Sequence, residues 1–150
     1  MPRFNHMELT LPPGVLTERR REIAAFYGDL FGWESLDVPI VGQLGLLLRT
    51  DPETSQFILL TEQRKAMSAP GYDHLGLLYD HREEVDALLE KAKKWQDREP
   101  RVEIKEYADL HIAGTTVHAF YVRHLLPIWF DVQVIENEPG MAPGRRWRFE

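Results

Sequence analysis

The chain has 150 residues, of which 43% are hydrophobic, a size and composition that suit one domain or two closely fused half-domains with a packed core. Its formal net charge of -6 excludes the basic field through which proteins usually bind nucleic acid. It has no cysteine, which excludes disulfides, a zinc–thiolate site and a thiol nucleophile. The first residues carry no apolar signal region, and no apolar run approaches the roughly 20 residues that span a bilayer. We therefore expect a cytoplasmic protein that has no membrane partner.

The first half of the chain has the pattern of a strand, a helix and three further strands. Residues 4–11 alternate apolar and polar side chains, which predicts a strand, and Pro12-Pro13-Gly14 ends it. Thr17 is a candidate helix N-cap, and Gly32 is a candidate stop signal. Between them, apolar residues recur with a helical period: Ile23, Phe26, Tyr27, Leu30 and Phe31. Three β-prone stretches follow, at residues 33–38, 43–49 and 56–61.

The same order of elements returns after a polar connector at residues 65–71. Residues 73–79 predict a short strand, and Asp80 with Glu83 three residues later has the pattern of a helix N-cap with its capping box. The helical stripe consists of Val85, Leu88, Leu89 and Ala92, and three strands are predicted at residues 101–107, 115–123 and 128–135. This is a repeat of element order, which predicts a first module at residues 1–64 and a second at residues 72–137.

The tail, residues 138–150, has a different composition. Two Pro-Gly pairs precede a stretch in which charged and aromatic residues alternate: Arg145, Arg146, Trp147, Arg148 and Phe149. This stretch is either packed on its own domain or frayed, or else it docks on a partner subunit or closes over a pocket.

Three stretches, in this order along the chain, carry a family resemblance. They are AFYGDLFGWE at residues 25–34, DHLGL at residues 73–77 and AFYVR at residues 119–123. They resemble, in turn, the first helix and its exit, the opening strand of the second half and the strand before the last turn in the vicinal oxygen chelate superfamily (glyoxalases, bleomycin-resistance proteins and extradiol dioxygenases). That turn is usually polar in the family, whereas HLLPI at residues 124–128 gives it an apolar rim. The resemblance implies an α+β fold in which two βαβββ modules form a cupped eight-stranded mixed sheet.

The resemblance also implies a metal site made by His6, His74 and Asp131, with Asp131 at a position where family members commonly carry glutamate. Two imidazoles and one carboxylate form the facial triad that suits iron(II), and manganese, zinc or nickel can occupy the same set. Strand alternation agrees with this assignment, because His6 shares a polar face with Glu8, and Asp131 shares one with Gln133.

Three further polar residues are candidates for a substrate pocket: Glu8, His118 and Gln133. His118 would serve as a general base or a hydrogen-bond donor if it points into the cup, and otherwise it is a strand residue with a backbone partner. Relatives with four ligands add a side chain from the last strand of the first half, and Ile58, which stands near that position, cannot bind a metal. Its presence favours a three-ligand, dioxygenase-like site over an isomerase-type site.

Three classes of function fit these observations. The first is a metal-dependent enzyme of dioxygenase type, or else of lyase or isomerase type, that chelates two neighbouring oxygens of a small substrate. The second is a metal-free binding protein of the bleomycin-resistance type, for which the apolar turn and the acidic charge would suit an aromatic or cationic ligand. The third is a regulatory or scaffold module, suggested only by the tail. The resemblance further implies a homodimer.

Overall fold

The computed structural model describes residues 1–139, which divide into two compact units. Of the described residues, one unit comprises 1–70 with 125–127, and the other comprises 71–124 and 128–139. The charged and aromatic stretch at residues 145–149 lies outside the described residues. No helix in the described part of the chain is long and apolar enough to cross a membrane.

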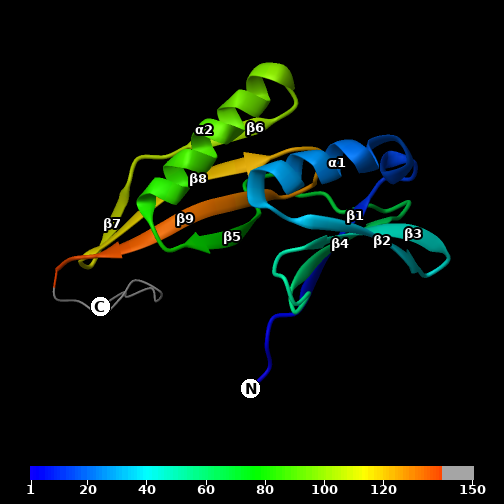
Figure 1. Cartoon of the computed structure of the whole chain (residues 1–150), viewed down its shortest axis with the longest axis horizontal. Coiled ribbons are helices and arrows are strands. Elements are labelled where there is room, and N and C mark those ends of the chain that lie inside the picture. Colours follow the sequence, from blue (N-terminus) through cyan, green and yellow to red (C-terminus); the bar gives the residue numbers. More distant parts are fainter. Residues whose placement is uncertain (140–150) are drawn as a thin grey trace. The chain divides into compact units, whose positions relative to one another are not determined.

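The first unit is one helix over a four-stranded mixed sheet (Figure 1). Its strands lie in the order β1-β4-β3-β2, with bounds β1 (His6–Leu11), β2 (Glu34–Ile40), β3 (Gln43–Arg49) and β4 (Phe57–Glu62). β1 pairs with β4 in parallel, and the other pairs are antiparallel. Helix α1 (Val15–Phe31) covers one face of the sheet, where apolar side chains are fully buried: Leu9, Ile23, Phe26, Leu48 and Leu60.

Helix α1 is capped by a strand. Glu62, at the end of β4, accepts hydrogen bonds from the backbone N–H groups of Gly14 (3.0 Å) and Leu16 (2.6 Å). The helix therefore begins before Thr17, and the prediction of Thr17 as N-cap was wrong because the capping carboxylate comes from a distant strand. Gly32 ends the helix in the left-handed conformation, at φ 72°, as predicted.

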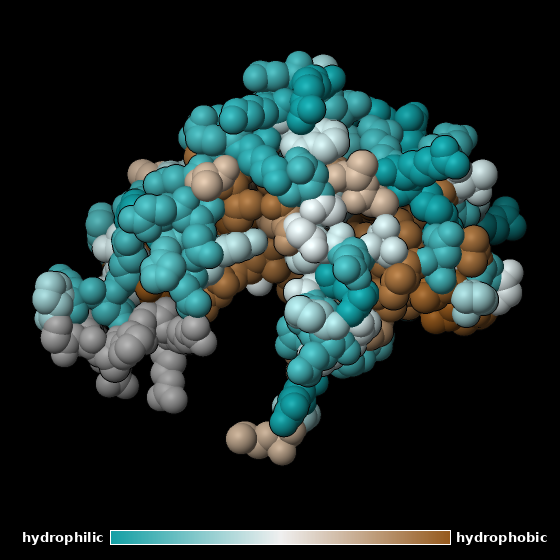
Figure 2. Space-filling model, viewed as in Figure 1, coloured by the Kyte–Doolittle hydropathy of each residue, from teal (hydrophilic) through white to brown (hydrophobic). Residues whose placement is uncertain are grey.

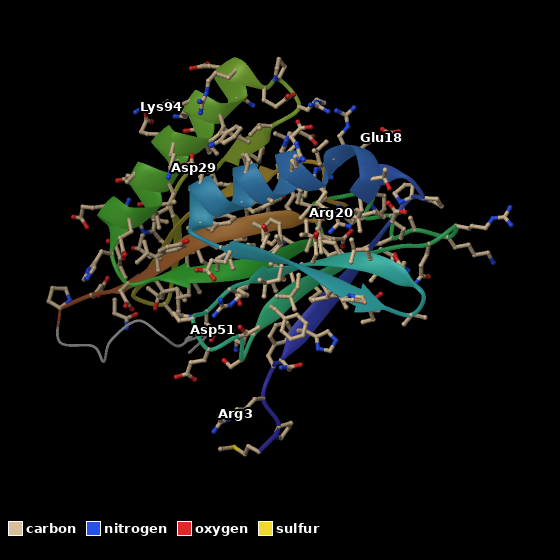
Figure 3. The ribbon with its side chains drawn as sticks, turned by 45° about the vertical axis from the view of Figure 1, so that its right-hand side comes forward. Arg3, Glu18, Arg20, Asp29, Asp51 and Lys94 are labelled. Carbon is tan, nitrogen blue, oxygen red and sulfur yellow. The ribbon has the colours of Figure 1, made fainter. Side chains whose placement is uncertain are left out.

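Arg20 fixes α1 to its sheet (Figure 3). Its guanidinium donates to the carboxylate of Asp37 (2.5 Å) and to the carbonyl oxygens of Leu44 (2.6 Å) and Gly45 (3.1 Å), all on the β2–β3 hairpin. The outward surfaces of both helices are hydrophilic (Figure 2). Each helix therefore uses only its sheet-facing side for packing.

The second unit repeats this plan with one helix over a mixed sheet in the order β5-β9-β8-β6. Its elements are β5 (His74–Tyr79), α2 (Arg82–Arg98), β6 (Glu103–Glu106), β7 (Leu110–Ile112), β8 (Thr115–Arg123) and β9 (Trp129–Asn137). β5 pairs with β9 in parallel. Helix α2 begins one residue later than predicted: the backbone N–H of His81 donates to Glu84 (3.0 Å), where Asp80 and Glu83 were expected to form the cap.

Strands β6 and β7 are one edge strand interrupted by a β-bulge. Both pair with β8, and residues 107–109 lie opposite residues 118–119, so the edge strand carries one more residue than its partner. A bulge of this kind bends the strand and redirects its side chains. The sequence predicted only the first part, at residues 101–107, because the bulge breaks the alternation.

The predicted fold class is confirmed: the chain is α+β, with two βαβββ-like modules built on mixed sheets. The described residues form four strands in the first sheet and five in the second, where eight in all were predicted. The extra strand arises because the bulge divides the edge strand of the second sheet. In both modules the first strand pairs in parallel with the last one.

Candidate functional site

A cavity of about 380 Å³ lies in the second unit, on the sheet face opposite α2. Strand alternation gathers its polar residues: on β9, Asp131 and Gln133 face the cavity, whereas Val132 and Val134 are buried on the other face. The lining comes from β5, the bulge, β7, β8 and β9: His74, Tyr107, Ala108, Leu110, Val117, Ala119, Tyr121, Asp131 and Gln133.

His74 and Asp131 form the polar centre of this cavity. Nδ1 of His74 lies 2.8 Å from the carbonyl oxygen of Tyr72, which can only accept, so Nδ1 carries the proton and Nε2 presents its lone pair. Nε2 lies 3.7 Å from Oδ2 of Asp131, too far for a hydrogen bond. Two ligands that each lie about 2.1 Å from one metal ion are about 3.0–3.4 Å apart. A small side-chain rotation would therefore bring both onto one cation.

Asp131 is a buried carboxylate without a strong partner. Its side chain is only 10% exposed, and among residues 1–139 its Oδ1 has no hydrogen-bond partner. Burial raises the pKa of Asp131 to about 6, and the nearby His74 opposes that rise only in part. A buried acceptor without a donor costs free energy of folding. A bound cation would supply what this carboxylate lacks, so the residues present fit a metal.

His6 lies in the first unit, on the face of β1 that turns away from α1. Its Nδ1 is 2.8 Å from Oδ1 of Asn5, whose amide nitrogen donates to the carbonyl oxygen of Ser55 (2.9 Å). This orientation of Asn5 places the proton of His6 on Nδ1 and leaves Nε2 free to bind a metal, as in His74. The ring of His6 also stacks on Phe57, with centroids 4.9 Å apart.

The three predicted ligands therefore fall in two groups. His74 and Asp131 meet in the second unit, and His6 belongs to the first. In the part of the chain that the structure describes, no group of three histidine or carboxylate side chains lies close enough to hold a metal ion.

His118 lies on the α2 side of β8, outside the cavity. Its Nδ1 is 2.7 Å from Asp109, and its Nε2 is 2.8 Å from Asp86 of α2. Tyr121, which faces the cavity, stands three positions further along β8, an odd step, so alternation turns the two side chains to opposite faces. The structure therefore does not place His118 where it was expected, among the pocket residues.

Glu8 lies on the first unit and accepts a hydrogen bond from the hydroxyl of Thr61 (2.6 Å). The parallel register places Leu59 beside Glu8 and Phe57 beside His6, whereas Ile58 is buried on the α1 side. The sequence placed the fourth-ligand position near Ile58, and the register puts Phe57 and Leu59, rather than Ile58 itself, on the face that carries His6 and Glu8. Neither neighbouring β4 side chain can bind a metal, so β4 still supplies no ligand on this face.

Tyrosines form a cavity wall that was not predicted. The ring of Tyr121 lies 4.8 Å from that of His74 and 4.9 Å from that of Tyr107, between centroids. Burial first, and then the charge of Asp131, raise the pKa of Tyr121, so its hydroxyl stays protonated at neutral pH and can donate. Alternation along β8 could have identified Tyr121, but Tyr107 stands in the bulge, where no period applies.

No known family profile matches the chain, and no curated protein matches it in sequence. Solved structures match it over nearly its whole length. A protein assigned to the glyoxalase family from Bacillus anthracis is 18% identical and has a TM-score of 0.61, with 92% of this chain and 97% of that chain covered. The fosfomycin resistance protein FosX from Listeria monocytogenes is 17% identical and has a TM-score of 0.64, with 88% of this chain and 90% of that chain covered. Lactoylglutathione lyase from Agrobacterium tumefaciens is 17% identical and has a TM-score of 0.57, with 89% of this chain and 94% of that chain covered.

Proposed function

The chain has the vicinal oxygen chelate fold, and from this premise we propose that it is a metal-dependent enzyme that acts on a small oxygenated substrate. The observation that carries the proposal is the pair of His74 and Asp131, which meet in a cavity. Nε2 of His74 lies 3.7 Å from Oδ2 of Asp131, and Oδ1 of Asp131 has no hydrogen-bond partner within residues 1–139. FosX, which shares the fold, has been crystallised with Mn(II). We further propose that the protein works as a cytoplasmic homodimer.

The proposed metal ligands are Nε2 of His74, the carboxylate of Asp131 and Nε2 of His6. In both histidines a hydrogen bond fixes the proton on Nδ1, an arrangement typical of metal-binding histidines because it sets the tautomer and the ring orientation. Two imidazoles and a carboxylate favour iron(II), with manganese, zinc or nickel as alternatives.

When bound, the ion would supply Lewis acidity to two neighbouring oxygens of the substrate. The protein's own groups would orient that substrate. The Tyr121 hydroxyl can donate a hydrogen bond, and the amide of Gln133 can donate one and accept another. The rings of Tyr107 and Tyr121 would shield the reacting atoms from water. Because β4 supplies no fourth ligand, a dioxygenase-like reaction is the first proposal and a lyase or isomerase reaction is the second.

The tyrosine wall favours one alternative, a metal-free binding protein. Tyr72, Tyr121 and Tyr107 form a continuous row of rings, with Trp129 packed against Tyr72 at 5.4 Å between centroids. An aromatic surface beside the carboxylate of Asp131 would suit a planar or cationic ligand. Such a protein would bind its ligand stoichiometrically, without turnover and without metal.

The decisive experiment is metal content. The protein would be purified without added metal and without a metal-binding tag, then analysed by plasma mass spectrometry beside His74→Ala, Asp131→Ala and His6→Ala. His111→Ala is the matched control, because His111 is exposed and does not line the cavity. We expect about one metal per chain, retained in the control and lost when any proposed ligand is removed. A wild-type protein that takes up none of iron, manganese, zinc or nickel would refute the enzyme and favour the binding protein.

A further inference from the structure

The bulge between β6 and β7 forms one side of the cavity, and we call residues 107–110 the bulge wall. Tyr107, Ala108 and Leu110 line the cavity, yet Tyr107 is 43% exposed and Leu110 is 50% exposed. Residues 107–109 lie between the paired segments β6 and β7. Among the described residues, they form no backbone–backbone hydrogen bond. Apolar burial and backbone hydrogen bonds therefore do little to hold residues 107–109, whereas Leu110 is held by its pairing with Val117 of β8.

A side chain holds it instead. Asp109 is the one residue of the bulge wall that turns to the α2 side, and each of its carboxylate oxygens has a charged partner. Oδ2 accepts a hydrogen bond from Nη2 of Arg82 at the start of α2 (2.7 Å), and Oδ1 lies 2.7 Å from Nδ1 of His118 on β8. These charge-assisted bonds link the exposed wall to the helix and to the centre of the sheet.

His118 can satisfy its surroundings only as an imidazolium. Its second ring nitrogen, Nε2, lies 2.8 Å from Oδ1 of Asp86, so both nitrogens face carboxylate oxygens that can only accept. A neutral ring would direct a lone pair at one of the two carboxylates. Burial opposes protonation, but the hydrogen bonds to Asp109 and Asp86 outweigh it, and the pKa of His118 is raised.

Two other ionisable side chains near His118, those of Arg82 and His111, have further hydrogen-bond partners. Arg82 also pairs with Glu136 of β9, through Nη2 (2.6 Å) and Nε (3.1 Å). His111 of β7 bonds to the hydroxyl of Thr116 on the same face of the sheet (2.9 Å). When His118 loses its proton, Arg82 remains as the only cation bonded to Asp109 within residues 1–139, and Glu136 competes for it. Deprotonation would thus loosen the bulge wall without releasing it.

We propose that Asp109 is a positioning residue that holds the bulge wall against the cavity, and that it holds the wall more tightly while His118 carries both ring protons. The proposal rests on the proposed function only in treating this cavity as the active site. The motion itself needs no metal and no substrate. Access to the cavity would then be greater in mildly basic than in mildly acidic solution.

Hydrogen exchange measured by mass spectrometry tests the proposal on the full chain. The amides of β7 (Leu110–Ile112), which pairs with β8 directly beside the bulge, would be followed at about pH 5.5 and at about pH 8.5, on either side of the histidine range, with correction for the intrinsic exchange rate. The variants are Asp109→Asn and His118→Gln. Glu103→Gln is the matched control, because it breaks an ion pair on the same edge strand, with Arg123 (2.9 Å), outside the bulge. Amides of β9 report whether each variant is folded.

In the wild type we expect protection of these β7 amides to fall about threefold to tenfold between the two pH values, as a partly exposed ion pair is lost. Both variants should show low protection at both pH values, and Glu103→Gln should behave as the wild type does. Equal wild-type protection at the two pH values would overturn the proposal, as would a control that loosens the wall as much as Asp109→Asn does.

A parallel Mn(II) titration separates this proposal from the proposed function. Asp109→Asn leaves His74, Asp131 and His6 intact, so it should bind Mn(II) as the wild type does while its β7 amides exchange faster. A wild-type protein that binds no Mn(II), iron, zinc or nickel but shows the pH-dependent exchange would refute the proposed function and support the positioning role of Asp109.

Discussion

Replacing Asp131 by asparagine should stabilise the metal-free protein at neutral pH. Burial raises the pKa of this carboxyl from its ordinary 3.8 to about 6. One pKa unit corresponds to about 1.4 kcal/mol, so the ionised form destabilises the fold by about 3 kcal/mol. An asparagine amide at this site also loses solvation, at about 1 kcal/mol or somewhat more. The net gain for Asp131→Asn is then about 1–2 kcal/mol, or about 2–8 °C in Tm for a chain of this size.

The sign of the effect depends on pH. Below about pH 4 the carboxyl is protonated in the folded and the unfolded states, so the penalty is absent. Between about pH 4 and about pH 6 the unfolded chain releases its proton first, and wild-type stability falls. Above that range the penalty is complete. The gain of the variant should therefore appear between these pH values and remain constant above them.

Denaturant and thermal unfolding of metal-stripped protein, from about pH 4 to about pH 8, would measure this difference. Asp97→Asn is the control, since Asp97 is exposed on α2. Wild-type protein with added Mn(II) should gain stability that Asp131→Asn does not gain, because only a carboxylate is neutralised by the ion. The reasoning about this buried charge is refuted if Asp131→Asn is no more stable than the wild type at pH 7. It is also refuted if the stability of the variant depends on pH as that of the wild type does.

Three further outcomes follow from particular contacts. Glu62→Gln should cost about 1–2 kcal/mol in urea unfolding, because an amide can replace only one of the two acceptor oxygens that cap α1. Gly76→Leu should lower Mn(II) affinity at least about tenfold with little loss of stability in isothermal titration and unfolding, since a β-carbon at residue 76 would already lie 3.0 Å from the amide of Gln133 on the cavity face. Phe57→Ala should weaken Mn(II) binding about threefold to tenfold, measured by the same titration, as the ring of His6 loses its stacking partner.

Where apolar and polar residues alternate cleanly along the chain, the sequence was sufficient to predict the strands and their faces. The bounds predicted for β3 and β8 are those observed, and the polar face of β9 that holds Asp131 and Gln133 followed from period two alone. β4 is buried on both faces at Ile58, Leu59 and Leu60, so its phase is not visible in the sequence. That is why the sequence placed the fourth-ligand position only near Ile58.

The remaining differences come from contacts between distant parts of the chain. The carboxylate of Glu62 moves the start of α1, and it stands 46 residues from the N–H of Leu16 that it binds. The bulge wall depends on Asp109, His118 and Arg82, which lie on three different elements. No local pattern marks such partners. The cavity's tyrosine wall was missed for the same reason, because Tyr107 reaches it only through the bulge.

The parallel pairing of first and last strands has a consequence for synthesis on the ribosome. Among residues 1–139, β5 has one neighbour in its sheet, β9, and β9 is the last of the strands to be made. Until residues 129–137 emerge, β5 has no edge to pair with, and His74 has no Asp131 beside it. The four-stranded sheet of the first unit can form much earlier, when β4 joins β1, although residues 125–127 join that unit later. The nascent chain should therefore fold in two separated steps, with His74 and Asp131 brought together only at the second.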